Sequence, residues 1–178
     1  MTVKPFIIKE IPGLYRIIPL RVFRRTPGVF FDLVPMELLP RIDGIDRVIH
    51  EHGALSPGPL GNVDHPWYMH CYQEDNLLVL HGTRYVDIYT QKHGKVERFI
   101  VSTDMVKHND DVIFNGPSML VWPCGVFHRI RSGETGSASL NFAVRHEGFD
   151  IRTNFSIYDL DTESGEFRMI REGHLDQY

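Results

Sequence analysis

The chain of 178 residues is predicted to be an all-β protein, a sandwich or barrel of short strands. Beyond residue 52, the sequence is a series of short segments rich in Val, Ile, Leu, Phe and Tyr. Turns such as KHG, PCG and SGETG separate these segments at regular intervals. Helical spacing of apolar residues is scarce. We therefore expect one domain over residues 1–178, with little helix.

The part of the chain before the strands is expected to be an arm, residues 1–45, which carries six prolines within its first 40 residues. Such an arm is expected to extend over the barrel or over a second copy of the chain. One or two helical turns are predicted at 35–39. A short helix is predicted at 43–52, where Ile45, Val48 and Ile49 recur at helical spacing.

Six strands are expected to follow, at 77–80, 84–90, 96–101, 118–122, 137–145 and 154–160. Segment 77–80 is apolar at all four positions, so we expect both of its faces to be covered. Segment 84–90 alternates, with Tyr85 and Tyr89 on one face and Val86 on the other. The tail, 147–178, is predicted to contain a hairpin that turns near 164–165.

Composition limits the class of partner. The chain has 19 basic and 23 acidic residues, a net charge of −4, which argues against nucleic acid or an anionic membrane and favours a small-molecule substrate. The two cysteines form no disulfide framework, and no apolar run is long enough for a membrane helix. We therefore expect a cytoplasmic protein.

Two short stretches carry the candidate chemistry. In PWYMHCYQEDNLLVLHG, residues 66–82, His70 precedes a cluster of polar and acidic residues. A run of apolar residues follows this cluster and leads to Gly82. In PCGVFH, residues 123–128, a tight turn leads into His128. Cys71 directly follows His70, and Cys124 lies in the turn before His128. Neighbouring residues of a strand point to opposite faces, so no thiol nucleophile is predicted.

These stretches resemble the two motifs of the cupins, H-x-H-x(3,4)-E-x(6)-G and P-x-G-x-x-H. The segment 123–128 matches the second motif. In the first motif, Asp75 takes the place of the glutamate, His70 is the second histidine, and Tyr68 takes the place of the first. The resemblance covers about residues 50–146 and implies a cupin-type jelly-roll barrel, a double-stranded β-helix.

The resemblance also implies a site for one divalent transition metal: Fe, Mn, Zn or Ni. Its ligands would be His70, Asp75 and His128, because imidazole and carboxylate together suit these ions. Glu74 competes with Asp75, since some cupins have a shorter spacing, and His65 is a candidate for a fourth ligand. The alternative is that the two histidines form a polar pocket without a metal.

Other side chains are candidates for chemistry and binding at the same site. Tyr68 and Tyr72 are candidates for a catalytic acid or base. Tyr85, Tyr89 and Trp122 are candidates for the substrate pocket, although a tyrosine stripe on a strand is often only packing.

Three functions are compatible with these residues. The first is a metal-dependent enzyme that acts on a small polar metabolite as an oxygenase, lyase or isomerase. The second is a metal-free nucleotide-sugar isomerase or epimerase, because residues 78–102 and 123–128 resemble the barrels of such enzymes. There, Arg84, Arg129 and Arg131 could bind a diphosphate. The third is a non-catalytic carbohydrate-binding protein. A homodimer is expected, because segment 77–80 and the arm both require a covering surface.

Overall fold

The computed structural model describes residues 6–178, and these residues form mainly β-structure. Among them, the helical elements are the short α1 (Ile151–Asn154) and the 3-10 turns η1 (Met36–Leu38) and η2 (Gly173–Asp176). The prediction of an all-β class is confirmed, and η1 lies in the turn predicted at 35–39. No helix within the described range is long and apolar enough to cross a membrane.

Fifteen strands are present in the described part of the chain. The first six are β1 (Lys9–Ile11), β2 (Tyr15–Pro19), β3 (Arg21–Thr26), β4 (Val29–Leu33), β5 (Gly44–His50) and β6 (Leu55–Ser56). The next five are β7 (Trp67–Met69), β8 (Gln73–Tyr89), β9 (Glu97–Ser102), β10 (Met105–His108) and β11 (Asp111–Asn115). The last four are β12 (Ser118–Trp122), β13 (Phe127–Arg145), β14 (Ile157–Leu160) and β15 (Phe167–Arg171).

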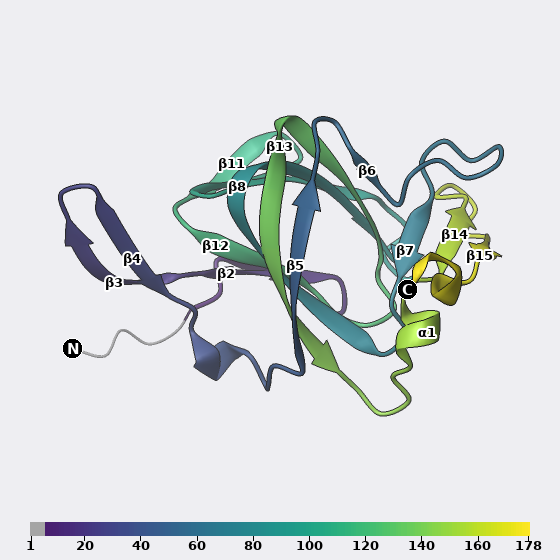
Figure 1. Ribbon diagram of the computed structural model, residues 1–178, viewed down its shortest axis with the longest axis horizontal. Coiled ribbons are helices and arrows are strands. Elements are labelled where there is room, and N and C mark those ends of the chain that lie inside the picture. The colour runs from purple at the N-terminus through teal and green to yellow at the C-terminus, as the bar shows by residue number, and fades with distance from the viewer. Residues whose placement is uncertain (1–5) are drawn as a thin grey trace.

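Strands β8 and β13 are the centre of the fold, and both belong to two layers of the barrel (Figure 1). In the first layer, the first part of β8 pairs with β12, the last part of β13 pairs with β5, and β2 and β1 follow β12. In the second layer, the rest of β8 pairs with β9, and the first part of β13 pairs with β7 and β6. Strands β10 and β11 extend this layer beyond β9, and β14 and β15 extend it beyond β7.

The two strands change layer near Gly82 and Gly136. Gly82 has a φ of +70°, and a Cβ atom there would lie 2.0 Å from the carbonyl oxygen of Gly136. Only glycine fits this bend, because the backbones approach so closely. The glycine that predicted a break between segments 77–80 and 84–90 therefore bends one continuous strand, and the expected two strands are both parts of β8.

The main apolar core fills the barrel between the two layers, and a second cluster covers the outer face of the first layer. Leu77 and Val79 belong to the inner core, whereas Leu78 packs outside against Leu39. The prediction that both faces of 77–80 are covered is confirmed for the first three residues. It is wrong for Leu80, which is 53% exposed.

The helix predicted at 43–52 is wrong, because this segment forms β5. Its backbone pairs antiparallel with β13, from Gly44 opposite Ala143 to His50 opposite Ser137. Pairing along a whole neighbouring strand outweighs the weak helical spacing of three apolar residues. In the strand, Ile45 and Ile49 lie on the exposed face.

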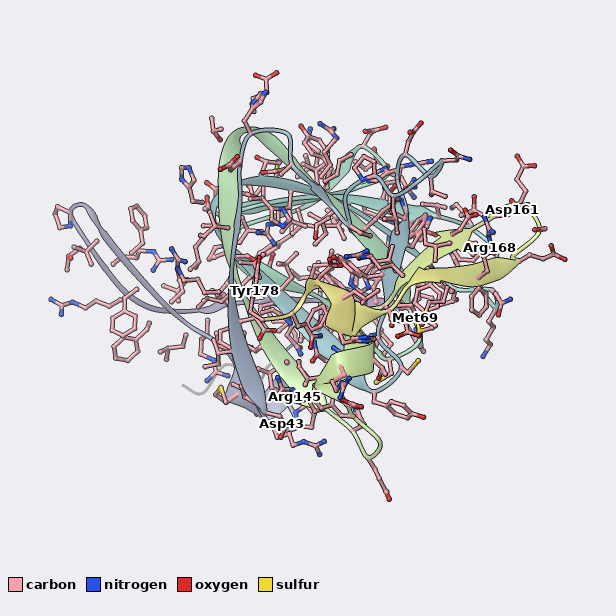
Figure 2. The ribbon with its side chains drawn as sticks, turned by 45° about the vertical axis from the view of Figure 1, so that its right-hand side comes forward. Asp43, Met69, Arg145, Asp161, Arg168 and Tyr178 are labelled. Atoms are coloured by element: carbon pink, nitrogen blue, oxygen red, sulfur yellow. The ribbon has the colours of Figure 1, made fainter. Side chains whose placement is uncertain are left out.

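The two ends of the chain add a hairpin each. In the N-terminal region, β1 and β2 join the first layer, and β3 and β4 form a separate hairpin that projects from the barrel (Figure 1). The tail contains the predicted hairpin, β14–β15, with Asp161 and Arg168 near its tip (Figure 2). The strand predicted at 154–160 begins three residues later, at Ile157, because Asn154 ends α1, where the Asp150 side chain accepts a hydrogen bond from the backbone of Arg152.

Candidate functional site

A cavity of about 320 Å³ lies between the two layers of the barrel. Its walls come from β5, β7, β8, β12 and β13 and from the segment around α1. Its polar lining includes Asp46, His50, Tyr68, His70, Asp75, Arg84, His128, Ser139 and Asn141. The cavity therefore gathers polar side chains from both layers of the barrel.

The two motif histidines and the acid meet at one end of this cavity. Strand β13 runs between β7 and β8, so His128 lies opposite Tyr68 on one side and Ile88 on the other. Asp75 lies opposite Trp122 in the first layer, and His70 is in the link between β7 and β8. The jelly-roll topology thus unites residues that are up to 58 positions apart in the sequence, from His70 to His128.

The three side chains are buried and close to one another. The Nε2 atom of His70 lies 3.2 Å from Oδ2 of Asp75, and the Nε2 atom of His128 lies 3.8 Å from the same oxygen. The nearest ligand atoms of all three residues lie within 4.8 Å of one another. This arrangement is compact enough for proton transfer or for the binding of one ion.

Neighbouring groups fix the orientation of each side chain. Oδ1 of Asp75 accepts hydrogen bonds from Gln73, at 2.8 Å, and from Asn141, at 2.7 Å. Nδ1 of His70 donates to the carbonyl oxygen of Asn154. Nδ1 of His128 lies 3.2 Å from the carbonyl oxygen of Val126, so its Nε2 is directed toward Asp75 and the cavity.

These contacts give the three groups different charges. Burial opposes ionisation of Asp75, but His70 and His128 outweigh it and hold the carboxyl pKa well below its usual range. Burial likewise opposes a charge on His70, yet the Asp75 carboxylate and the Asn154 carbonyl raise the pKa of His70. Burial and the neighbouring His70 lower the pKa of His128 to about 4. At neutral pH, His128 is a neutral imidazole beside the His70–Asp75 ion pair.

Tyr68 lies beside both histidines in the same cavity. Its ring centroid is 6.3 Å from that of His70 and 6.0 Å from that of His128. Burial raises the pKa of Tyr68, so its phenol keeps its proton at neutral pH. Tyr68 can therefore act as a proton donor to a substrate bound in the cavity beside His128.

The same three residues also fit a transition metal. They supply two imidazoles and one carboxylate, the donor set that suits Fe, Mn, Zn or Ni. The Asn154 carbonyl holds Nδ1 of His70, which is the outer-shell support that ligating histidines usually have. A metal held there would polarise a carbonyl oxygen of the substrate.

Two predicted ligands do not join the cluster. Glu74 forms an ion pair with Arg16 at 2.8 Å, because adjacent strand residues point to opposite faces and Asp75 points inward. His65 precedes β7, and its backbone oxygen accepts a hydrogen bond from Arg129 at 2.9 Å. Its side chain is not among those that line the cavity.

Of the tyrosines and tryptophan predicted near the substrate, only Tyr68 and Trp122 line the cavity. Tyr72 is 47% exposed and lines a separate surface pocket. Tyr85 and Tyr89 face outward, since Val86 and Ile88 occupy the inner face of that part of β8.

The sequence named Arg84 as a candidate for binding a diphosphate but did not place it inside the barrel, and it did not identify His50 or Ser139. Arg84 shares its face of β8 with the buried Val86, so strand alternation could have identified it as an inward cation. His50 and Ser139 also line the cavity. His50 was missed because segment 43–52 was expected to be a helix.

Comparisons with known proteins relate the chain to solved structures. No family model matches the chain, and no curated protein matches it. It is similar to QdtA, a sugar 3,4-ketoisomerase from Thermoanaerobacterium thermosaccharolyticum in complex with TDP. The TM-score is 0.54 and the sequence identity 10%, over 79% of this chain and 85% of that chain.

Two further structures are more distant. A 3,4-ketoisomerase from Helicobacter canadensis has a TM-score of 0.47 and 12% identity, over 76% of this chain and 85% of that chain. The capsular polysaccharide assembling protein CapF from Staphylococcus aureus has a TM-score of 0.40 and 19% identity, over 74% of this chain and 30% of that chain. The layered barrel and the likeness to QdtA show a cupin-type jelly-roll fold.

Proposed function

We propose that the chain is a nucleotide-sugar isomerase or epimerase, which moves protons at a carbon next to a keto group. The observation that carries this proposal is the neutral His128 beside the His70–Asp75 ion pair, in a cavity that also contains Tyr68. The substrate class is supported by the shared fold with a sugar 3,4-ketoisomerase that binds TDP.

The proposed reaction begins with the removal of a proton by Nε2 of His128 from the carbon next to the keto group. Negative charge then develops on the keto oxygen, which the charge of the nearby His70 imidazolium stabilises and to which the Tyr68 phenol can supply a proton. For isomerisation, the neighbouring hydroxyl loses its proton and the former carbonyl carbon gains one, which gives the isomeric ketone. For epimerisation, Tyr68 returns a proton to the original carbon from the opposite face.

Asp75 holds His70 in its charged form throughout. Because the carboxylate is bound by Gln73 and Asn141, it stays ionised and does not take the substrate proton. The neutral His128 and the protonated Tyr68 can act as base and acid at the same pH.

The proposal is tested by incubating the protein with a TDP-linked 4-keto hexose and separating the products by chromatography. We expect TDP to raise the melting temperature and the keto sugar to be converted to an isomer or epimer. Binding of TDP without any conversion would contradict the proposal and would favour a non-catalytic carbohydrate-binding protein.

A second candidate function is a metal-dependent enzyme, favoured by the convergence of His70, Asp75 and His128 within 4.8 Å. Its test is elemental analysis of protein that was purified without a nickel column. One Fe, Mn, Zn or Ni per chain, lost in both His70→Ala and His128→Ala, would support it. Protein that binds none of these metals after reconstitution would contradict it.

We also propose that residues 1–178 form one domain, which acts as a cytoplasmic homodimer. The β3–β4 hairpin supports the dimer, because it projects from the barrel with Phe23, Phe30 and Phe31 exposed. Light scattering after size-exclusion chromatography should give twice the chain mass, and Phe30→Ser should lower it. A monomer at micromolar concentration would contradict the proposal.

A further inference from the structure

The end of the cavity away from His70 contains a buried arginine. Arg84 is 1% exposed, and within residues 6–178 no carboxylate lies within ion-pair distance of its guanidinium. Its nearest hydrogen-bond partners are neutral: Ser137 Oγ lies 3.1 Å from Nε, and the backbone oxygen of Val48 lies 3.2 Å from Nη2. A guanidinium has five N–H groups, so most of its donors remain for another partner.

Two more polar groups at this end have no partner within the described structure. Nδ1 of His50 and Oγ of Ser139 are buried, and neither forms a hydrogen bond there. Both residues line the cavity with Arg84. Buried polar atoms are nearly always satisfied in folded proteins, so two groups without partners and a guanidinium with spare donors around one space indicate a bound group.

The proton-transfer cluster consists of His70, Asp75 and His128. A sugar derivative can span the distance between this cluster and the end that contains Arg84. Asp46 and His50 lie on the same face of β5, four residues apart, which corresponds to about 13 Å along a strand. Asp46 accepts a hydrogen bond from Asn141, which also donates to Asp75, so Asp46 marks the end that contains the cluster. His50, opposite Ser137, marks the end that contains Arg84.

We infer that Arg84, His50 and Ser139 form a subsite for an anionic group of the substrate, a carboxylate or a phosphate. This inference deepens the proposed function and rests on it for the nature of the remaining substrate. The guanidinium matches either oxyanion through paired N–H donors, and Ser139 can donate a further hydrogen bond.

Electrostatics at this end support the same conclusion. Burial lowers the pKa of Arg84 to about 10, which shows that the charge lacks compensation from the surrounding protein. Burial, together with the charge of Arg84, lowers the pKa of His50 to about 4. His50 is therefore neutral and can donate through Nδ1 to an anion without adding a second buried charge.

The test measures thermal unfolding in increasing inorganic phosphate or sodium acetate, with sodium chloride used to keep the ionic strength constant. The wild type is expected to melt at a higher temperature with one or both ions. Arg84→Met is expected to weaken the apparent affinity by about tenfold or more, since a charge-assisted pair is lost. The matched control is Arg47→Met, on the exposed face of β5, which should respond as the wild type does.

Ser139→Ala provides a second variant that should fold normally, because its hydroxyl has no hydrogen bond to lose. It is expected to weaken the affinity for the same ion. A response to phosphate alone assigns the subsite to a phosphate group, and a response to acetate alone assigns it to a carboxylate. The inference would be overturned if neither ion shifted the melting temperature of the wild type. It would also be overturned if Arg84→Met and Ser139→Ala both showed the same shift as the wild type.

The outcome is separable from that of the proposed function, because the ion titration needs no turnover. If ion binding depends on Arg84 but the keto sugar is not converted, the subsite is supported and the proposed reaction is contradicted. Conversion of the keto sugar without any ion response would retain the reaction and reject the subsite.

Discussion

At the residue scale, the contacts of the His70 and His128 side chains decide which of the two imidazoles is charged. Both nitrogens of His70 face acceptors, Asn154 on one side and Asp75 on the other, so the protonated form is favoured. His128 has one acceptor close to Nδ1, and its Nε2 lies 3.8 Å from Asp75. The difference in partners therefore leaves a neutral base, His128, beside a fixed positive charge, His70.

Replacement of His128 by Asn should lower kcat/KM for the keto sugar by about a thousandfold, which is typical of the loss of a general base. The asparagine occupies similar space but cannot accept the proton. His81→Asn is the control, because His81 is exposed on β8. Equal activities in the two variants would show that His128 is not the base.

Replacement of Tyr68 by Phe should lower the rate of conversion by about a hundredfold, since the phenol proton is lost while the ring remains. Tyr72→Phe should leave the rate unchanged, because Tyr72 lies outside the cavity. Steady-state kinetics of both variants provide the comparison. A greater loss in Tyr72→Phe would contradict the assignment.

The sequence predicted part of this site, because the resemblance to the two cupin motifs singles out His70, Asp75 and His128. It could not choose between Asp75 and Glu74, since that choice depends on where the strand's alternation begins. The structure places Asp75 inward and pairs Glu74 with Arg16. The sequence named Arg84 as a candidate for a diphosphate but could not place it beside His50, because that proximity depends on β5, which the sequence predicted to be a helix.

At the element scale, the central feature is the bend of β8, which allows one strand to serve both layers. The sequence predicted the apolar segments on either side of Gly82 but treated the glycine as the end of a strand. Local composition does not distinguish a turn from a bend inside a strand, because both require a positive φ. Local composition also does not show which strand a segment pairs with, so the sequence predicts a helix at 43–52 where the structure has β5.

Gly82→Ala should destabilise the fold by about 2 kcal/mol or more, because the new methyl group meets the carbonyl of Gly136 and the backbone conformation becomes strained. Gly61→Ala is the control: its φ is +58°, yet nothing lies within 4 Å of its Cβ position. It should cost only the strain, about 1 kcal/mol. Urea unfolding of both variants measures the difference, and equal losses would contradict the close approach at Gly82.

At the scale of the whole molecule, stability should depend on pH through the buried histidines. The pKa of His50 and that of His128 are each lowered from 6.5 to about 4, so both stay neutral in the folded protein while the unfolded chain takes up protons. Their contribution to stability is present above pH 6.5 and is lost as the pH falls toward 4. His70, whose pKa is raised, contributes in the opposite direction.

The melting temperature is therefore expected to fall between pH 6.5 and 4, where His50 and His128 bind protons only in the unfolded chain and His70 is protonated in both states. His50→Gln should reduce the slope, since the variant lacks a titrating group there, whereas His81→Gln should retain it. Calorimetry across this range tests the prediction. A melting temperature that rises as the pH falls would contradict it.

The most direct test of the proton-transfer site is deuterium incorporation from D₂O into the carbon next to the keto group of a TDP-linked 4-keto hexose. Proton NMR follows the loss of that C–H signal. We predict that the signal disappears with the wild-type protein and persists with His128→Asn. No exchange with the wild type, or equal exchange with the variant, would contradict the assignment of His128, beside the His70–Asp75 pair, as the base.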